Sequence, residues 1–164
     1  NAAGATNCAT GKFFNLRRFT LSRFEEPLDS RGGQLPYWFE HSLLAFVRRP
    51  DLARLENHGL GELVGVSHSK NHWGDEIQSQ FLSEPTKAWL RLSWRHYLSW
   101  FSKAEYELSK SNSVEMINSW LLNAEQNWQM LEDSNVLLDE PRNNGAWIRP
   151  WRQALIEYQR EYSI

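Results

Sequence analysis

The stretch from Thr86 to Leu131, TKAWLRLSWRHYLSWFSKAEYELSKSNSVEMINSWLLNAEQNWQML, decides the fold. Apolar residues recur at spacings of 4, 3, 4, 3 and 4 in its first half and of 3, 4, 3, 4 and 3 in its second. Such spacing places one apolar stripe along each of two helices. We therefore predict helices over 86–109 and 113–131. The stripes consist of Leu90, Trp94, Tyr97, Phe101, Ala104 and Leu108, and of Val114, Ile117, Leu121, Ala124, Trp128 and Leu131.

The junction between these helices predicts how they pack. Asn112 is followed three residues later by Glu115, which resembles a capping box at a helix start. Only about three residues connect the two predicted helices. Because so short a connection joins helices that fold back on each other, we expect an antiparallel hairpin. Trp89 and Trp100 add a second apolar strip to the first helix, which is typical of a helix at the centre of a bundle.

Weaker signals lie upstream of this hairpin. A helix is predicted from Pro36 to its stop at Pro50, with an apolar face, and Asp51 is expected to cap a short helix that Gly59 ends. A short strand over 63–66 and a turn or two of helix over 75–82 are expected to follow. The face of the helix predicted from Pro36 is formed by Phe39, Leu43, Phe46 and Val47.

At the carboxyl end, a last helix is predicted from Pro150, with Trp151, Leu155, Tyr158 and Tyr162 on one face. At the amino end, residues 1–11 are small and polar and are expected to form a flexible leader. The predicted fold is all-α or nearly so: a helical bundle built on a long antiparallel helical hairpin, with a less regular N-terminal third. Residues 12–164 are predicted to form a single domain.

Composition excludes several classes of protein. The chain has 164 residues, of which 41% are hydrophobic and 23% charged, which fits one globular domain. It has no apolar run of 18 residues, so no membrane-spanning helix is expected. The net charge of −2 is not that of a polycation, and the single cysteine, Cys8, cannot form an intrachain disulfide. Since phosphate-binding and dinucleotide-binding fingerprints are lacking, we expect no cofactor.

Tryptophan is the unusual component, with nine residues. An indole combines a large apolar face with one N–H donor, and tryptophan is common at binding hot spots. The leading hypothesis is a non-enzymatic domain that docks a protein partner through an aromatic-rich helical face, and the alternative is a tryptophan-heavy core. The sequence is also compatible with a homodimer. The candidate partner-binding residues are Trp89, Trp100, Trp120, Trp147 and Trp151.

A second hypothesis is nucleic-acid binding. Residues 12–31 interleave basic side chains, among them Arg17, Arg18 and Arg23, with phenylalanines, which could contact phosphates and stack on bases. Basic residues also repeat every four positions on the first long helix, at Lys87, Arg91 and Arg95. The plain interpretations are phenylalanines in the core and arginines that are solvated or paired with acids.

A third hypothesis is a metal-dependent hydrolase. His68, His72 and Asp75 lie in a glycine-rich stretch, and histidine and aspartate are residue types that bind metal ions. A metal ion held by three such ligands, with one coordination position open, could activate water. The stretch lacks the glutamate that directly follows the first histidine of a zinc-protease helix, so an ordinary polar loop is the plainer interpretation. His96, on the first long helix, is expected to be a hydrogen-bonded core histidine rather than a general base.

Overall fold

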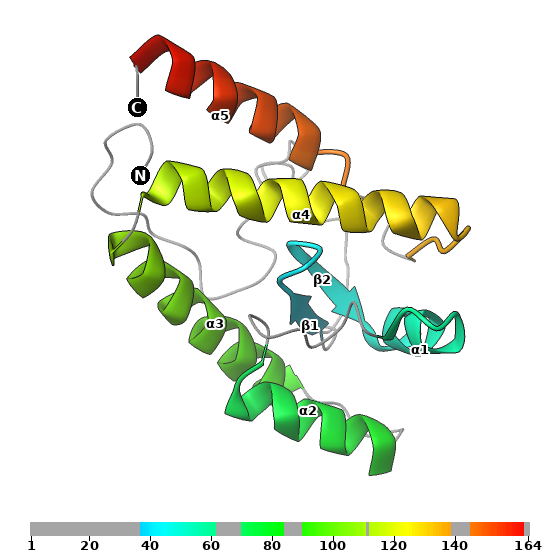
Figure 1. Cartoon of the computed structure of the whole chain (residues 1–164). Helices are drawn as coiled ribbons and strands as arrows, with labels where there is room; N and C mark the ends of the chain where they lie inside the picture. Colours follow the sequence, from blue (N-terminus) through cyan, green and yellow to red (C-terminus); the bar gives the residue numbers. More distant parts are fainter. Residues whose placement is uncertain (1–36, 62–69, 84–89, 111, 139–144, 163–164) are drawn as a thin grey trace, which may run out of the picture. The chain divides into compact units, whose positions relative to one another are not determined.

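The computed structural model describes residues 37–61, 70–83, 90–110, 112–138 and 145–162, all within one compact unit, Leu35–Ile164. These residues are mostly helical, which confirms the predicted fold class (Figure 1). Among them, no helix is long and apolar enough to cross a membrane. The elements, in chain order, are β1 (Tyr37–Glu40), β2 (Ala45–Arg48), α1 (Arg49–Asn57), α2 (His72–Ser83), α3 (Leu90–Lys110), α4 (Ser113–Asp133) and α5 (Ile148–Tyr162).

The helix predicted from Pro36 is wrong, because residues 37–48 form a β-hairpin. Its strands β1 and β2 pair antiparallel, with Tyr37 opposite Arg48 and Glu40 opposite Ala45. Nearly every strand residue is buried, so both faces of the ribbon are covered. Apolar residues occur at consecutive positions in 37–48, so the alternation of apolar and polar residues that is typical of a half-buried strand is absent. The hydrophobic pattern of such a run cannot distinguish a strand from a helix.

The start of α1 also differs from the prediction. Arg48 is the N-cap residue, and Pro50 lies in the first turn of α1 instead of stopping an earlier helix. Asp51 is not the cap: its buried carboxylate pairs with Arg54 at 3.3 Å and with Arg48 at 3.8 Å. Gly59, with a φ of 71°, follows the helix end as predicted.

The two long helices form as predicted. The Asn112 side chain accepts hydrogen bonds from the backbone N–H groups of Val114 and Glu115, and so caps α4. Residues 86–89 of the first predicted helix lie outside the described residues. The predicted helix over 75–82 is longer and forms α2, while the strand predicted over 63–66 also lies outside them. The buried stripe of α4 consists of Val114, Leu121, Ala124, Trp128 and Leu131.

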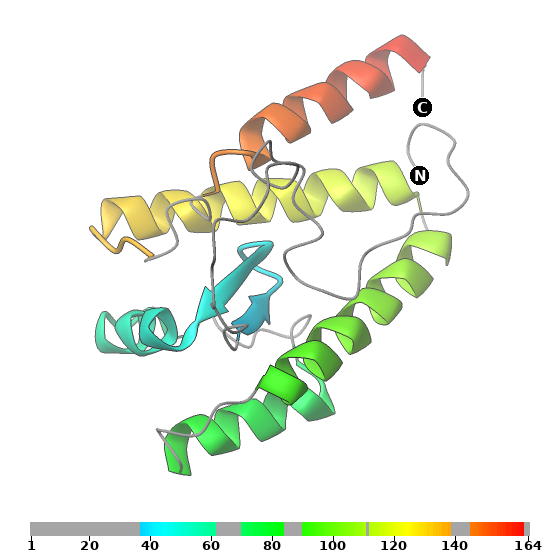
Figure 2. The ribbon, with the colours of Figure 1, turned by 180° about the vertical axis from the view of Figure 1, so that it is seen from behind.

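The long helices do not pack along their whole length. From the junction at Asn112 they diverge, and the β-hairpin lies between them (Figures 1 and 2). α3 packs mainly on α2 and β1, and α4 packs mainly on α5. The central position expected for the first long helix is therefore wrong, because the hairpin, and not α3, lies between the other elements.

The core is centred on the hairpin and α4. Trp38, Leu43 and Val47 of the hairpin are at most 1% exposed and belong to one apolar cluster with Leu121, Ala124, Trp128 and Leu131 of α4. Ile77 of α2 and Ile148 of α5 complete this cluster from two further sides. The last helix begins two residues before Pro150, and α5 runs back along α4 (Figure 1).

Candidate functional site

The tip of the hairpin carries buried polar side chains that a two-stranded ribbon alone could not accommodate. Glu40 is wholly buried, and its two carboxylate oxygens accept hydrogen bonds from the indole of Trp38 at 2.8 Å and from the amide of Ser42 at 3.0 Å. Both donors suit a charged carboxylate. The polar pair Glu40–His41 interrupts an apolar run, and that interruption was the one sequence signal for this network.

Helices α3 and α4 hold the tip from two sides. Trp100 on α3 donates a hydrogen bond from its indole nitrogen to Nδ1 of His41, at 3.1 Å. Trp120 on α4 meets the same imidazole edge to face, with ring centroids 5.0 Å apart. Both indoles are partly buried, and their contacts with His41 show that the hairpin covers part of each of these two candidate docking residues.

Two further side chains of α4 bind the backbone of the tip. Asn127 donates to the carbonyl oxygen of Ser42 and Trp128 to that of Leu43, both at 2.9 Å. A buried carbonyl without a donor costs free energy, so these bonds fix where the tip lies against α4. The tip is therefore a structural junction, and its polar groups have protein partners.

His96 lies one turn before Trp100 and is wholly buried, as expected of a core histidine. Its Nε2 lies 3.0 Å from the carbonyl oxygen of Phe39, and its Nδ1 lies 3.1 Å from Oδ1 of Asn71. Trp38 stacks on its ring, with centroids 4.2 Å apart. Burial lowers the pKa of His96, while the hydrogen bond to Phe39 and the charge of Asp75 act in the opposite direction.

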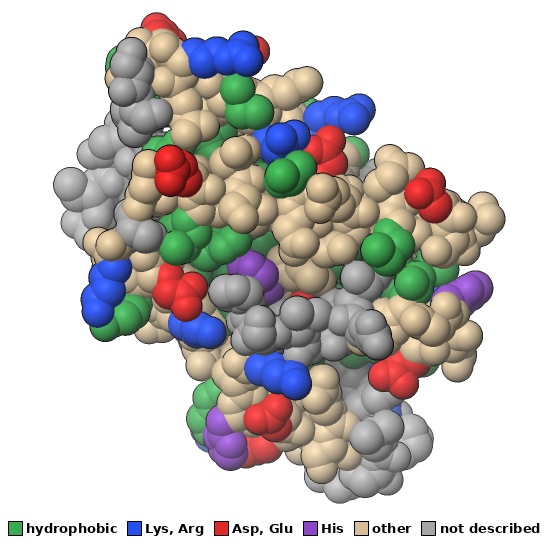
Figure 3. Space-filling model, in the orientation of Figure 1, with side chains coloured by type: hydrophobic (Ala, Val, Ile, Leu, Met, Phe, Trp, Pro, Cys, Tyr) green, Lys and Arg blue, Asp and Glu red, His purple; other side chains and the backbone are tan. Residues whose placement is uncertain are grey.

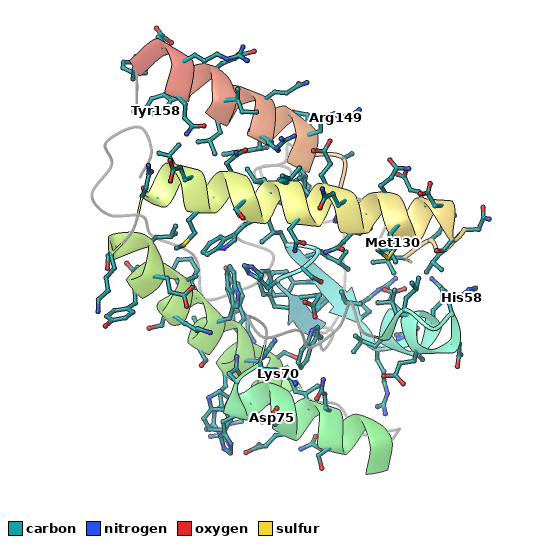
Figure 4. All side chains as sticks on the ribbon, viewed as in Figure 1. His58, Lys70, Asp75, Met130, Arg149 and Tyr158 are labelled. Carbon is teal, nitrogen blue, oxygen red and sulfur yellow. The ribbon has the colours of Figure 1, made fainter. Side chains whose placement is uncertain are left out.

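The metal candidates are only partly placed. His68 lies outside the described residues. His72 and Asp75 lie in the first turn of α2 as exposed side chains, and Figure 4 labels Asp75 there. Nε2 of His72 lies 3.0 Å from a carboxylate oxygen of Glu76. Within the described ranges, no three His, Cys, Asp or Glu side chains form a group that could hold a metal ion. The metal site remains a prediction that includes an undescribed residue.

The nucleic-acid candidates are also divided. Arg17, Arg18, Arg23 and Lys87 lie outside the described residues, whereas Arg91 is exposed on α3. The guanidinium of Arg95 lies over the ring of Trp73 on α2, 4.4 Å from its centroid. This cation–π contact joins α2 to α3 and gives Arg95 a structural partner.

The remaining tryptophan candidates are found at the start of α5. Trp89 lies outside the described side chains. Trp147 is 39% exposed and Trp151 is 67% exposed, which makes Trp151 the most exposed of the described indoles that were proposed to bind a partner. The backbone N–H of Trp151 donates to the carbonyl of Trp147, so the two rings are one helical turn apart.

These two rings belong to a longer row, which we call the α5 edge and define as Trp147, Trp151, Tyr158 and Tyr162. At about 100° per residue the four side chains fall within an arc of about 60° along one side of the helix. The rings of Tyr158 and Tyr162 contact each other, with centroids 4.7 Å apart. Tyr158 is partly buried and Tyr162 is 58% exposed, so the row lies between the core and solvent faces of α5.

Helix α5, which carries this edge, is held against the rest of the unit by ion pairs with α4 and by a buried side chain. Arg149 and Arg152 contact the two carboxylate oxygens of Glu125 on α4, at 2.9 and 3.1 Å, and Ile148 is buried. Arg149 and Tyr158 lie toward opposite ends of α5 in Figure 4. Basic and acidic side chains are mixed over α4 and α5 in Figure 3, so neither sign of charge dominates that face.

Comparison with protein-family models, with curated proteins and with solved structures finds no significant match. The geometry of the chain itself is therefore the basis for assigning a function.

Proposed function

We propose that this chain is a non-enzymatic interaction domain that docks a protein partner through the α5 edge. The observation that carries the proposal is the exposure of Trp151, at 67%, on a helix that packs on α4 through an adjacent face. A large indole left in water loses the free energy of burial, about 1.5–3 kcal/mol for a large apolar side chain. A partner surface would recover it.

The composition of the edge supports a protein partner. Tryptophan and tyrosine are among the residues most enriched at binding hot spots, and the edge combines Trp147 and Trp151 with Tyr158 and Tyr162. An indole needs an apolar pocket, so the partner is expected to be a folded protein that offers such a pocket with a polar rim.

Charge around the edge supports the same choice. The basic side chains Arg149 and Arg152 both contact Glu125, and Glu157 and Glu161 lie on the exposed part of the same helix. This mixture gives no concentrated positive potential, which binding to a phosphate backbone requires. Docking through the α5 edge should therefore depend on apolar contact and change little with salt.

The experiment is affinity capture from native lysate with the whole chain as bait, with and without nuclease and at low and high salt. The test variant is Trp151→Ala. The matched control is Leu137→Ala, which truncates an apolar side chain that is 75% exposed but lies outside α5. We expect a stoichiometric protein that survives nuclease, is retained by Leu137→Ala, and is reduced at least about tenfold by Trp151→Ala.

Three results would overturn the proposal. Capture that disappears with nuclease would move the function to the basic segments of the sequence. Equal capture by both variants would place the docking surface elsewhere. A chain that captures only itself would identify the edge as a homodimer contact, which sedimentation of the purified chain would show as a dimer that Trp151→Ala dissociates.

A further inference from the structure

His96 is held by three elements and has no contact with solvent. The ring projects from α3, its Nε2 lies against the carbonyl of Phe39 on β1, and its Nδ1 lies against the side chain of Asn71, the residue before α2. Gly74 closes the remaining side, since a Cβ added there would lie 3.0 Å from Nδ1 and 3.0 Å from the ring of Trp38. The imidazole is therefore enclosed, and water can reach it only if an element moves.

The orientation of Asn71 is fixed by its other hydrogen bonds. Its Nδ2 donates to the carbonyl oxygen of His96 at 3.2 Å, and its Oδ1 accepts from the amide of Gly74 at 3.0 Å. If Oδ1 and Nδ2 were exchanged, the side-chain N–H groups would face the amide N–H of Gly74 and the side-chain oxygen would face the carbonyl oxygen of His96. The orientation of the Asn71 amide is therefore unique. Both ring nitrogens of His96 consequently face oxygen acceptors.

A neutral imidazole has one N–H and can satisfy only one of these acceptors. The carbonyl of Phe39 makes a buried contact with Nε2, whereas Oδ1 of Asn71 already has the amide of Gly74 as a donor. The proton therefore belongs on Nε2. Nδ1 then presents a lone pair to the lone pairs of Oδ1, so the contact with Asn71 is the weaker side of the enclosure.

The charged groups around this ring come from every packed element. Asp75 and Glu76 lie on α2, Glu40 lies on β1 beyond the indole of Trp38, and Arg95 adjoins His96 on α3. At the tip of the hairpin, His41 is bound to Trp100 one turn further along α3.

We propose that His96 is an acid-sensitive lock, and that proton uptake by its ring releases α2 from α3 and from the hairpin. The imidazolium gains more from water than from two oxygens in a closed site, because full burial removes its hydration. The added proton lies on Nδ1, the α2 side of the ring, and α2 is released because the hydration lost by burial of the charge outweighs the new hydrogen bond from Nδ1 to Oδ1 of Asn71.

The sign of the pH dependence follows from linkage. Burial lowers the pKa of His96 from its ordinary value of 6.5 in the folded chain, and release of α2 restores it. The closed state is therefore fully favoured above about pH 6.5 and loses stability as the pH falls through that value toward the folded-state pKa. The equilibrium constant for closure falls about tenfold for each pH unit by which the folded-state pKa lies below the ordinary one.

The experiment compares wild type with His96→Gln and with the matched control His72→Gln, a histidine whose side chain is 73% exposed. Urea unfolding at pH 7 and pH 5 should show a loss of stability on acidification in wild type and His72→Gln, and a smaller loss in His96→Gln. Amide exchange, corrected for its intrinsic pH dependence, should accelerate in α2 before α4. An equal loss in all three proteins, or a gain of stability on acidification, would overturn the proposal.

If His96→Gln does not fold, the titration of wild type still decides. The midpoint of the His96 ring resonance by proton NMR should lie below 6.5. A midpoint at or above 6.5 would mean that the two oxygen acceptors hold an imidazolium in the closed site. In that case acid would tighten the site, and the lock as proposed would be refuted.

Discussion

The indole nitrogen of Trp128 on α4 donates a hydrogen bond of 2.9 Å to the carbonyl oxygen of Leu43 at the hairpin tip, 85 residues earlier. Asn127 makes the equivalent bond to the neighbouring carbonyl, that of Ser42. The tip is thus defined by a helix distant in sequence. This relationship explains how a ribbon of two four-residue strands, which is marginal alone, becomes the centre of the unit.

Trp128→Phe should test this bond, because phenylalanine keeps most of the ring and removes the N–H. The carbonyl of Leu43 would stay buried without this donor, which costs about 1–3 kcal/mol. Urea unfolding should show that loss of stability. Trp151→Phe, the same change at an exposed position, should leave the unfolding midpoint unchanged, and an equal loss in both would show that the hydrogen bond contributes nothing.

Gly145→Ala should be strongly destabilising because two penalties coincide there. Its φ is 72°, and an added Cβ would lie 2.5 Å from the ring of Trp128. Gly59→Ala is the matched control, since φ is 71° and no atom lies within 4 Å. The control should lose about 1 kcal/mol, from the backbone alone. Gly145→Ala should lose clearly more by thermal unfolding, and equal losses would contradict the close contact with Trp128.

Glu125→Gln should have a small effect on stability although it removes both ion pairs between α4 and α5. The carboxylate is 25% exposed and Arg149 is 76% exposed, so solvent screens the interaction. We expect a loss below about 1 kcal/mol that shrinks further at high salt. Unfolding at two salt concentrations measures it, and a large, salt-independent loss would mean that the ion pairs rather than apolar contacts hold α5.

Trp151→Ala and Trp147→Ala should leave the fold intact, with changes of about 0.5 kcal/mol or less for the more exposed Trp151. Trp38→Ala is the contrasting variant, because that indole is 1% exposed and its removal should cost about 3–5 kcal/mol. Circular dichroism and thermal unfolding distinguish the two classes. Unfolding of the chain by Trp151→Ala would show that this ring belongs to the core.

Helix α4 could be predicted from sequence because its determinants are local. A stripe of apolar residues at helical spacing and the capping residue Asn112 lie within the segment itself, and the observed helix ends two residues beyond the prediction. Helix α5 was found for the same reason. Periodicity predicts an element wherever one face is buried and the other is solvated.

The hairpin could not be predicted, because its tip, residues 41–44, contains Ser42 but no glycine, proline, asparagine or aspartate, the stronger turn residues. Leu44 adopts a φ of 47°, a conformation that leucine rarely takes. Hydrogen bonds from Asn127 and Trp128 hold the turn, and the sequence of residues 37–48 does not predict these bonds. Tertiary packing overrides local preference here.

The tryptophans show the same limit at the candidate site. Composition identified them as the unusual feature but could not separate Trp100, which is bound to His41, from Trp151, which faces solvent. The separation depends on which side of each helix meets the hairpin. Similarly, the role of Asn71 beside His96 depends on a contact between residues 25 positions apart.

The most direct test of the proposed function is a hydroxyl-radical footprint of the chain, free and bound to its captured partner. Trp147 and Trp151 should be reactive in the free chain and become several-fold less reactive in the complex. Tyr106, which is 58% exposed on α3, should react equally in both states. Unchanged reactivity of both indoles in the complex, or protection of Tyr106 in their place, would contradict docking through the α5 edge.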